Sequence, residues 1–474
     1  MPSTILSVPS ASEDLAGVLA AIPRKAGASA DFPADVLAEA ERVAQNPPLP
    51  DADMTDVAFA TMDPVGSMDL DQAFFLARDG GGYTFLYAIA DIAAFVAPGG
   101  PMDVESHRRA ETIYAAGHRI PLYPTVLSEG VASLLQDQLR GAFVWRFALD
   151  HTGAVTSRTV SRARIRSRRR LDYVGVAQQL ADGTADEMLR LVREVGELRL
   201  ALEKQRGGAS LQAPETVVEQ VDGRYRLERR AVQPLENWNA ELSLLTGMEA
   251  ASIMIDGKVG ILRTMPAADP HALDVFRRQT EALGRPWAQG EAYGEYLDEV
   301  DGSGPGDLAI LHAATRLFRG AGYTAFDGQV PADTTQAAIG APYAHVTAPL
   351  RRLVDRYGLL VCEALCAGRE PADWVRAALP KLPEEMAHGG NISGQVANRS
   401  LDVVEAAVLA PRVGDVFDAT VVAQTAEGCI VQLTDPAVTA ACAGHAATGA
   451  RVRVRLVRAD VVTAEIVFEP AAAA

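Results

Sequence analysis

An acidic cluster beside apolar residues constrains this chain more than any other feature. Asp63, Asp69 and Asp71 fall within nine residues of each other, in the segment FATMDPVGSMDLDQAFFLA at 59–77. A proline and a glycine interrupt the segment, which is typical of a loop. The apolar residues on both sides predict that this loop is anchored in a core. Because neighbouring carboxylates repel one another, the cluster has to face solvent or bind cations.

Oxygen ligands of this kind suit hard cations such as Mg²⁺ or Mn²⁺. Two such ions, about 3.5–4 Å apart, are a common arrangement for hydrolysing a phosphodiester. A calcium-binding EF-hand loop is excluded, because it needs Gly at its sixth position and Glu at its twelfth. Counted from Asp69, these positions are Phe74 and Gly80. On spacing alone, a solvated acidic turn remains the alternative to a metal site.

The length and composition fit a soluble protein of several domains. The chain has 474 residues, 48% of them hydrophobic and 22% charged, which is ample for a large core. The sequence has no run of about 18 apolar residues, so we expect no membrane span. The N-terminal segment has no basic start typical of a secretory signal. We therefore expect a cytoplasmic protein.

Two groups of arginines stand out against a formal net charge of −17. Seven arginines fall within residues 158–170, and those at 162, 164, 166 and 168 alternate along the chain. Arg451, Arg453 and Arg455 alternate in the same way. Alternation places side chains on one face of a strand. We expect both faces to contact phosphates, with a merely solvated face as the alternative.

The texture of the sequence divides the chain into three parts. Residues 1–50 are rich in Ala, Ser and Pro and contain two short helical patterns. Residues 51–410 show strand-like apolar runs first and many helical patterns later, which predicts a large α+β body. Residues 411–474 read as short strands separated by turns. We predict that they form a small five-stranded OB barrel.

The acidic segment resembles the catalytic signature of the ribonuclease II (RNB) family. That signature is Asp-Pro followed by Asp-x-Asp-Asp-Ala. Asp63-Pro64 and Asp69-Leu70-Asp71-Gln72-Ala73 match it except at Gln72. Three further segments resemble family motifs in the same order along the chain: 112–135 (TIYAAGHRIPLYPTVLSEGVASLL), 165–176 (IRSRRRLDYVGV) and 344–357 (AHVTAPLRRLVDRY).

The resemblance implies an RNB-type catalytic domain over 51–410, closed by an S-one-type OB domain over 411–474. Members of the family usually carry two cold-shock OB domains before the catalytic domain. Only 62 residues precede Asp63 here, too few for two barrels. We therefore expect a short member that lacks them.

The resemblance also assigns roles to single residues. Asp63, Asp69 and Asp71 would hold Mg²⁺, or Mn²⁺, and position the attacking water. Arg351 would contact the scissile phosphate, because a guanidinium matches two phosphate oxygens. Tyr114 would stack on a base near the RNA 3′ end. The arginines at 451, 453 and 455 would bind the RNA backbone.

Two positions depart from the family pattern. Gln72 replaces the fourth aspartate, and its carbonyl oxygen can still ligate a metal ion without adding charge. Asn398 stands where the family often has an acid, and we expect both positions at the site.

The implied function is a monomeric, metal-dependent 3′-to-5′ exoribonuclease that hydrolyses single-stranded RNA to nucleoside 5′-monophosphates. The alternative is an RNA-binding protein whose nuclease site has decayed at Gln72 and Asn398.

Overall fold

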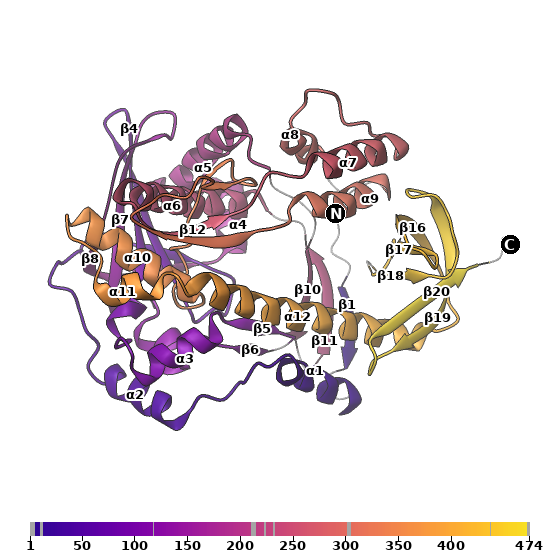
Figure 1. Ribbon diagram of the computed structural model, residues 1–474, viewed down its shortest axis with the longest axis horizontal. Coiled ribbons are helices and arrows are strands. Elements are labelled where there is room, and N and C mark those ends of the chain that lie inside the picture. The colour runs from indigo at the N-terminus through magenta and orange to yellow at the C-terminus, as the bar shows by residue number, and fades with distance from the viewer. Residues whose placement is uncertain are drawn as a thin grey trace.

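The computed structural model of the chain (Figure 1) describes residues 5–9, 13–116, 118–209, 215–221, 224–230, 233–300, 305–436 and 438–471. Within these residues, a six-stranded sheet forms the centre of the larger body. Its strands are, in spatial order, β8 (Val155–Arg166), β7 (Leu139–Leu149), β4 (Gly82–Ala90), β3 (Gln72–Asp79), β2 (Ala60–Met62) and β9 (Arg169–Leu171).

Strand β4, in the middle of this sheet, is buried on both faces. Its sequence GYTFLYAIA is apolar almost throughout, and the strand is buried from Phe85 to Ala90. Such a run fits a strand that is covered on both sides. Helix α5 (Glu187–Arg206) packs on β3, and α10 (Leu353–Cys366) packs on β8. The sheet thereby fixes the start of β3, where the acidic loop ends.

Helix α5 begins and ends at residues that favour helix termini. The Asp186 carboxylate accepts a hydrogen bond from the Leu189 amide at the N-terminus. Gly207 ends the helix with a left-handed φ of 74°, a conformation that glycine adopts without a steric penalty. Helix α6 (Pro234–Gly257) packs against α5.

The two predicted N-terminal helices are present as α1 (Glu13–Lys25) and α2 (Ala34–Ala44). The sequence analysis did not foresee the small sheet beside α1. In it, β1 (Ile5–Pro9) pairs with β11 (Arg224–Arg230), which pairs with β10 (Glu215–Val221).

Smaller elements complete the body. Strand pairs are β5 (Ile113–Ala115) with β6 (His118–Ile120), β12 (Val259–Thr264) with β13 (Gly322–Asp327), and β14 (Thr335–Gln336) with β15 (Ala341–Pro342). The remaining helices are α3 (Pro101–Arg109), α4 (Tyr173–Ala181), α7 (Pro270–Ala282), α8 (Tyr293–Asp298), α9 (Pro305–Ala314) and α11 (Asp373–Ala378).

The predicted C-terminal barrel is confirmed. Its strands are β16 (Val416–Gln424), β17 (Cys429–Leu433), β18 (Thr439–Cys442), β19 (Arg451–Asp460) and β20 (Glu465–Pro470), and they close in the order β16-β17-β18-β20-β19. The long helix α12 (Leu382–Leu409) runs from the larger body to this barrel (Figure 1). Ala406 and Leu409 at its end belong to the barrel core. The α+β architecture with a terminal OB barrel is thus as predicted.

The arginines of 158–170 correct one expectation. Strand β8 ends at Arg166, so Arg168 does not continue its face. Arg162 pairs with the buried Asp91 at 3.0 Å and lies over the Phe143 ring. Further ion pairs join Arg158 to Glu249, Arg164 to Asp53 and Arg169 to Asp186. These ion pairs connect elements of the fold, while the arginine side chains stay about a third exposed. The phosphate-contacting role expected for this face stays a prediction.

None of the described helices is both long enough and apolar enough to cross a membrane.

Candidate active site

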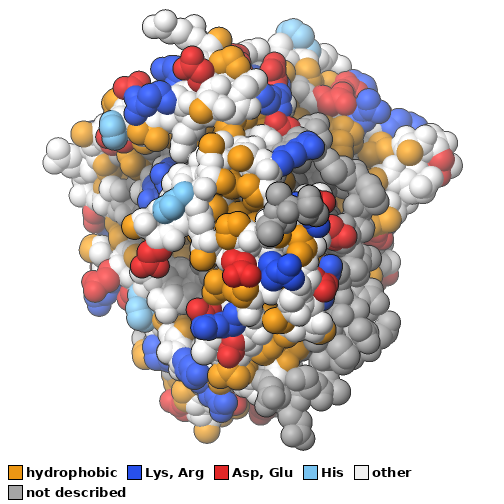
Figure 2. Space-filling model, turned by 90° about the vertical axis from the view of Figure 1, so that its right-hand side faces the viewer, with side chains coloured by type: hydrophobic (Ala, Val, Ile, Leu, Met, Phe, Trp, Pro, Cys, Tyr) orange, Lys and Arg blue, Asp and Glu red, His pale blue; other side chains and the backbone are white. Residues whose placement is uncertain are grey.

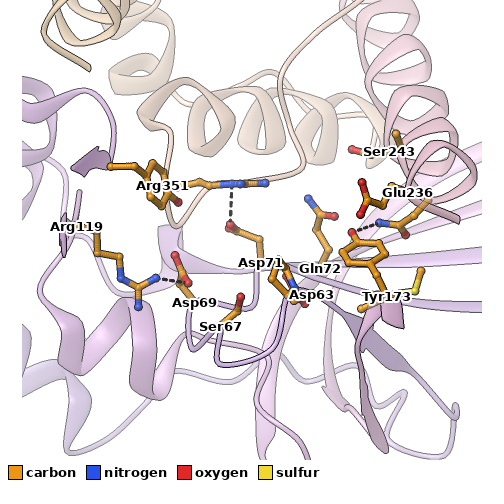
Figure 3. Close-up of a pocket in the computed structure, with 15 residues that line it drawn as sticks. Asp63, Ser67, Asp69, Asp71, Gln72, Arg119, Tyr173, Glu236, Ser243 and Arg351 are labelled. Atoms are coloured by element: carbon orange, nitrogen blue, oxygen red, sulfur yellow. Dashed lines mark hydrogen bonds and ion pairs between the residues drawn. The ribbon is translucent and has the colours of Figure 1, made fainter. Parts of the chain in front are cut away.

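The acidic loop opens into a cavity of about 480 Å³. The cavity lies between this loop, strand β5, the start of helix α6 and the segment before α10 (Figure 3). Its lining residues are Met62, Asp63, Pro64, Ser67, Asp69, Asp71, Gln72, Tyr114, Arg119, Tyr173, Glu236, Asn239, Ala240, Ser243 and Arg351. The structure therefore brings together all the predicted metal ligands, Arg351 and Tyr114.

The core anchors the acidic loop through Leu70. This side chain is fully buried, and its amide donates to the Ser133 hydroxyl at 2.9 Å. The Leu70 carbonyl in turn accepts from the Leu134 amide at 3.0 Å. With Leu70 directed into the core, the carboxylates on either side of it line the cavity. The expected anchoring of the loop is confirmed.

Asp71 is the most buried of the three acids, with 4% of the residue exposed. Its Oδ1 accepts a hydrogen bond from the Leu350 amide at 2.8 Å, and its Oδ2 lies 3.5 Å from Nε of Arg351. Burial raises the pKa of Asp71 to about 8, against the opposing effect of the Arg351 charge. Burial likewise raises the pKa of Asp63 to about 6; Arg351 lowers it, and Asp69 adds to the rise.

Asp69 is held by a side chain that the sequence analysis missed. Arg119 Nη1 lies 2.5 Å from Asp69 Oδ1 (Figure 3). Its Nη2 lies 2.8 Å from Glu129. The arginine thus fixes one acid of the cluster and offsets part of its charge. The available signal was its place within the segment 112–135, which already resembled a family motif.

Helix α6 supplies a second group that the sequence analysis missed. Glu236, Asn239 and Ser243 lie three and four residues apart, so one face of the helix lines the cavity opposite Arg119 (Figure 3). Asn239 donates to the Tyr173 hydroxyl at 3.0 Å. Polar residues at helical spacing near the start of an otherwise apolar helix were the signal.

Tyr114 lies on β5 and is 48% exposed. An exposed aromatic ring at the cavity suits stacking on a base.

The other predicted RNA-binding residues lie outside this cavity. Arg451, Arg453 and Arg455 are exposed on β19, and the first two line a separate cavity of about 550 Å³ on the barrel. Arg455 donates to the Gly414 carbonyl at 3.0 Å. On the side of the molecule that Figure 2 shows, basic side chains are interspersed with acidic ones.

The expectation for Asn398 is wrong. This residue is exposed on α12 and does not line the acidic cavity.

The donor chemistry of the cavity fits a hard divalent cation, since four carboxylates, including that of Glu236, and the side-chain amide oxygens of Gln72 and Asn239 line it. In the part of the chain that the structure describes, no three His, Cys, Asp or Glu side chains converge closely enough to hold an ion as they stand. Asp69 and Asp71 are instead directed toward Arg119 and Arg351.

Residues 51–365 match the RNB domain, which covers the sheet and the acidic cavity. The chain belongs to the RNB family. Residues 415–471 match the RNase II-type exonuclease C-terminal S1 domain, which is the barrel. As an RNB protein, the chain carries the catalytic-domain fold that its acidic signature predicted.

Curated relatives of this RNB chain include two ribonucleases R. That of Mycoplasma pneumoniae is 32% identical over 187 residues, which are 38% of this chain and 26% of the relative. That of Escherichia coli is 26% identical over 322 residues, which are 64% of this chain and 39% of the relative. The matches therefore span only about a quarter to two fifths of these relatives.

Solved structures share the RNB fold. The apo form of Mycoplasma genitalium RNase R superposes with a TM-score of 0.87 at 19% identity, covering 97% of this chain and 78% of that one. Yeast Ssd1, described as a pseudonuclease, superposes with a TM-score of 0.73 at 16% identity, covering 90% of this chain and 55% of that one.

Proposed function

We propose that this chain is a metal-dependent exoribonuclease that shortens single-stranded RNA from its 3′ end and releases nucleoside 5′-monophosphates. The observation that carries the proposal is the meeting of Asp63, Asp69, Asp71 and Arg351 in one cavity of an RNB domain. Two of the similar solved structures are of Mycoplasma genitalium RNase R in complex with RNA, which supports RNA as the substrate class.

Asp63, Asp69 and Asp71 would hold Mg²⁺ or Mn²⁺. Such ions activate water and stabilise the leaving oxygen of a phosphodiester. The burial that raises the pKa of Asp63 and Asp71 penalises their charged forms, and a cation between them would relieve this penalty.

The chain's own residues have distinct tasks in this proposal. Arg351 binds the scissile phosphate, and its guanidinium stabilises the negative charge that gathers on the phosphate oxygens. Tyr114 stacks on a base and helps to place the last nucleotides. Arg119 keeps Asp69 in the cavity.

A second candidate is an RNA-binding protein without nuclease activity. It is favoured by one observation, the neutral Gln72 at the position of the fourth family aspartate. The similarity to a pseudonuclease concerns the fold alone.

The deciding experiment incubates a 5′-labelled RNA oligomer with the protein and Mg²⁺ or Mn²⁺, with and without EDTA. We expect a ladder that shortens progressively from the 3′ end and disappears in EDTA. Labelled 5′-monophosphates should appear when the RNA carries label throughout its backbone. Internal cuts, or equal activity in EDTA, would contradict the proposal, and RNA binding without cleavage would favour the second candidate.

A further inference from the structure

Both ends of the Gln72 amide are engaged by the protein. The carbonyl oxygen accepts a hydrogen bond from the Tyr87 hydroxyl at 2.5 Å. The amide nitrogen donates to the Thr347 carbonyl oxygen at 2.7 Å. Because Tyr87 is buried in the neighbouring strand β4, with 1% of the residue exposed, it orients the amide from behind. A carboxylate at this position could not donate to Thr347.

Thr347 begins the segment that carries Arg351. The same segment is held at two further points, where the Leu350 amide donates to Asp71 at 2.8 Å and the Ala348 amide donates to Asp355 at 2.7 Å. Three side-chain contacts thus fix the backbone of five consecutive residues, 347–351. Among these contacts, that of Gln72 joins the segment to the central sheet without using a charge.

The Thr347 side chain extends this connection to the opposite wall of the cavity. The Ser243 hydroxyl of α6 donates to the Thr347 hydroxyl at 3.0 Å. Strand β4, strand β3, the Arg351 segment and helix α6 are therefore linked through Tyr87, Gln72, Thr347 and Ser243.

We propose that Gln72 is a positioning residue, which holds the Arg351 segment on β3 so that the guanidinium meets the scissile phosphate. This positioning role replaces the expectation that Gln72 is a fourth metal ligand. The inference rests on the proposed function for the identity of the reaction, whereas the contacts that carry it do not depend on a metal.

The two roles of Gln72 predict different results for the same substitutions. Gln72→Met keeps the length of the side chain and removes both hydrogen bonds. If Gln72 is a positioning residue, this variant should bind RNA more weakly in EDTA and turn over more slowly than wild type. The Mg²⁺ concentration at which it is half-saturated should change little. If Gln72 is instead a metal ligand, Gln72→Met should raise the half-saturating Mg²⁺ concentration. Gln72→Asp should then lower this concentration and keep or raise the turnover rate.

The experiment measures affinity for a fluorescent single-stranded RNA in EDTA and, separately, turnover against Mg²⁺ concentration. We expect Gln72→Met to lower both affinity and turnover by about tenfold, since two hydrogen bonds of ordinary strength are lost. Gln72→Asp should show the same losses. Gln424→Met in the barrel is the matched control, because it removes an amide contact to the Ala446 carbonyl far from the cavity; it should leave turnover unchanged.

A double-mutant cycle with Arg351→Gln isolates the connection. If Gln72 acts through Arg351, Gln72→Met should cost no further RNA affinity once Arg351 has been replaced. Tyr87→Phe should show the pattern of Gln72→Met more weakly, and it serves as the test if Gln72→Met does not fold. Melting temperatures establish that each variant is folded.

Several results would overturn the inference. These are additive losses in the cycle, an Arg351→Gln variant that binds RNA as well as wild type, or a Gln72→Met variant that changes only the Mg²⁺ dependence. A wild-type protein that cleaves no RNA would defeat the proposed function alone, because the affinity cycle in EDTA would still decide the role of Gln72.

Discussion

Asp71 carries the residue-scale prediction for chemistry. Asp71→Asn keeps the shape of the side chain and an oxygen that accepts from the Leu350 amide. RNA affinity should therefore stay close to that of wild type. Turnover should fall by at least about a hundredfold, the size expected when a group that acts in the transition state is lost. Single-turnover cleavage and RNA binding in EDTA check this, and a variant that cleaves at the wild-type rate would place the reaction elsewhere.

The same substitution has a predicted effect on stability without metal. The pKa of Asp71 is about 8 in the folded protein, raised from an ordinary value of 3.8. The folded state therefore binds more protons than the unfolded state between these values, so stability contributed by this group is lost as pH rises. In EDTA, Asp71→Asn should melt at a higher temperature than wild type. This difference should grow from about pH 4 to about pH 8.

The matched measurement is a melting series of both proteins over that pH range. A constant difference would show that the carboxyl group titrates normally. Mg²⁺ at pH 8 should raise the melting temperature of wild type more than that of the variant, because Mg²⁺ binds the ionised Asp71 carboxylate, which the variant lacks.

The sequence predicted the acidic residues of the site better than their partners. Asp63, Asp69 and Asp71 form one local pattern, which a reader can find without a structure. The contact of Asp69 with Arg119 spans 50 residues, and that of Gln72 with Thr347 spans 275. Such contacts depend on how distant segments pack, and the local spacing of residues does not predict this packing.

At the scale of elements, strand β8 separates structural from functional arginines. Asp91 is 1% exposed and its pKa is raised to about 6 by burial, with Arg162 opposing this rise. Arg162→Ala would leave this buried acid without its partner. Loss of one partner from a fully buried pair costs about 3–5 kcal/mol. Since a third of the Arg162 side chain is exposed, we expect about 2 kcal/mol here.

Arg164→Ala is the control for this prediction. Its pair with Asp53 has both side chains more than a third exposed, and such pairs contribute less than about 1 kcal/mol. Urea unfolding of the two variants gives the comparison, and RNA affinity should be unchanged in both. A large loss of RNA affinity in Arg162→Ala, with normal stability, would support the phosphate-contacting role.

Element prediction succeeded where a segment has its own signals. The short strands of 411–474 are separated by turns, and residues 1–50 contain two helical patterns. The pairing of β1 with β11 could not be predicted, because it joins residues more than two hundred positions apart. The ion pairs of the β8 arginines could not be predicted either, because alternation gives a face of the strand but not which side chains lie against it.

At the scale of the whole molecule, the barrel lies at the far end of α12 from the sheet (Figure 1). This helix has 28 residues, or about 42 Å at 1.5 Å per residue. Removing the barrel would expose Ala406 and Leu409, so point variants are the better test. Arg451 and Arg453 line the barrel cavity, whereas Arg455 is bonded to the Gly414 carbonyl.

We therefore predict that Arg451→Gln with Arg453→Gln weakens binding of long RNA and flattens its salt dependence. Each lost phosphate contact should reduce the slope of log affinity against log salt by about 0.7. Arg455→Gln should change the slope less. Short oligomers that fill only the acidic cavity should bind and be cleaved as by wild type, because the proposed catalytic groups lie in the larger body. Affinities at several salt concentrations, for one short and one long RNA, check this. An unchanged slope for long RNA would mean that these arginines only face solvent. In a chain with a net charge of −17, RNA would then be bound by the acidic cavity and its immediate surroundings alone.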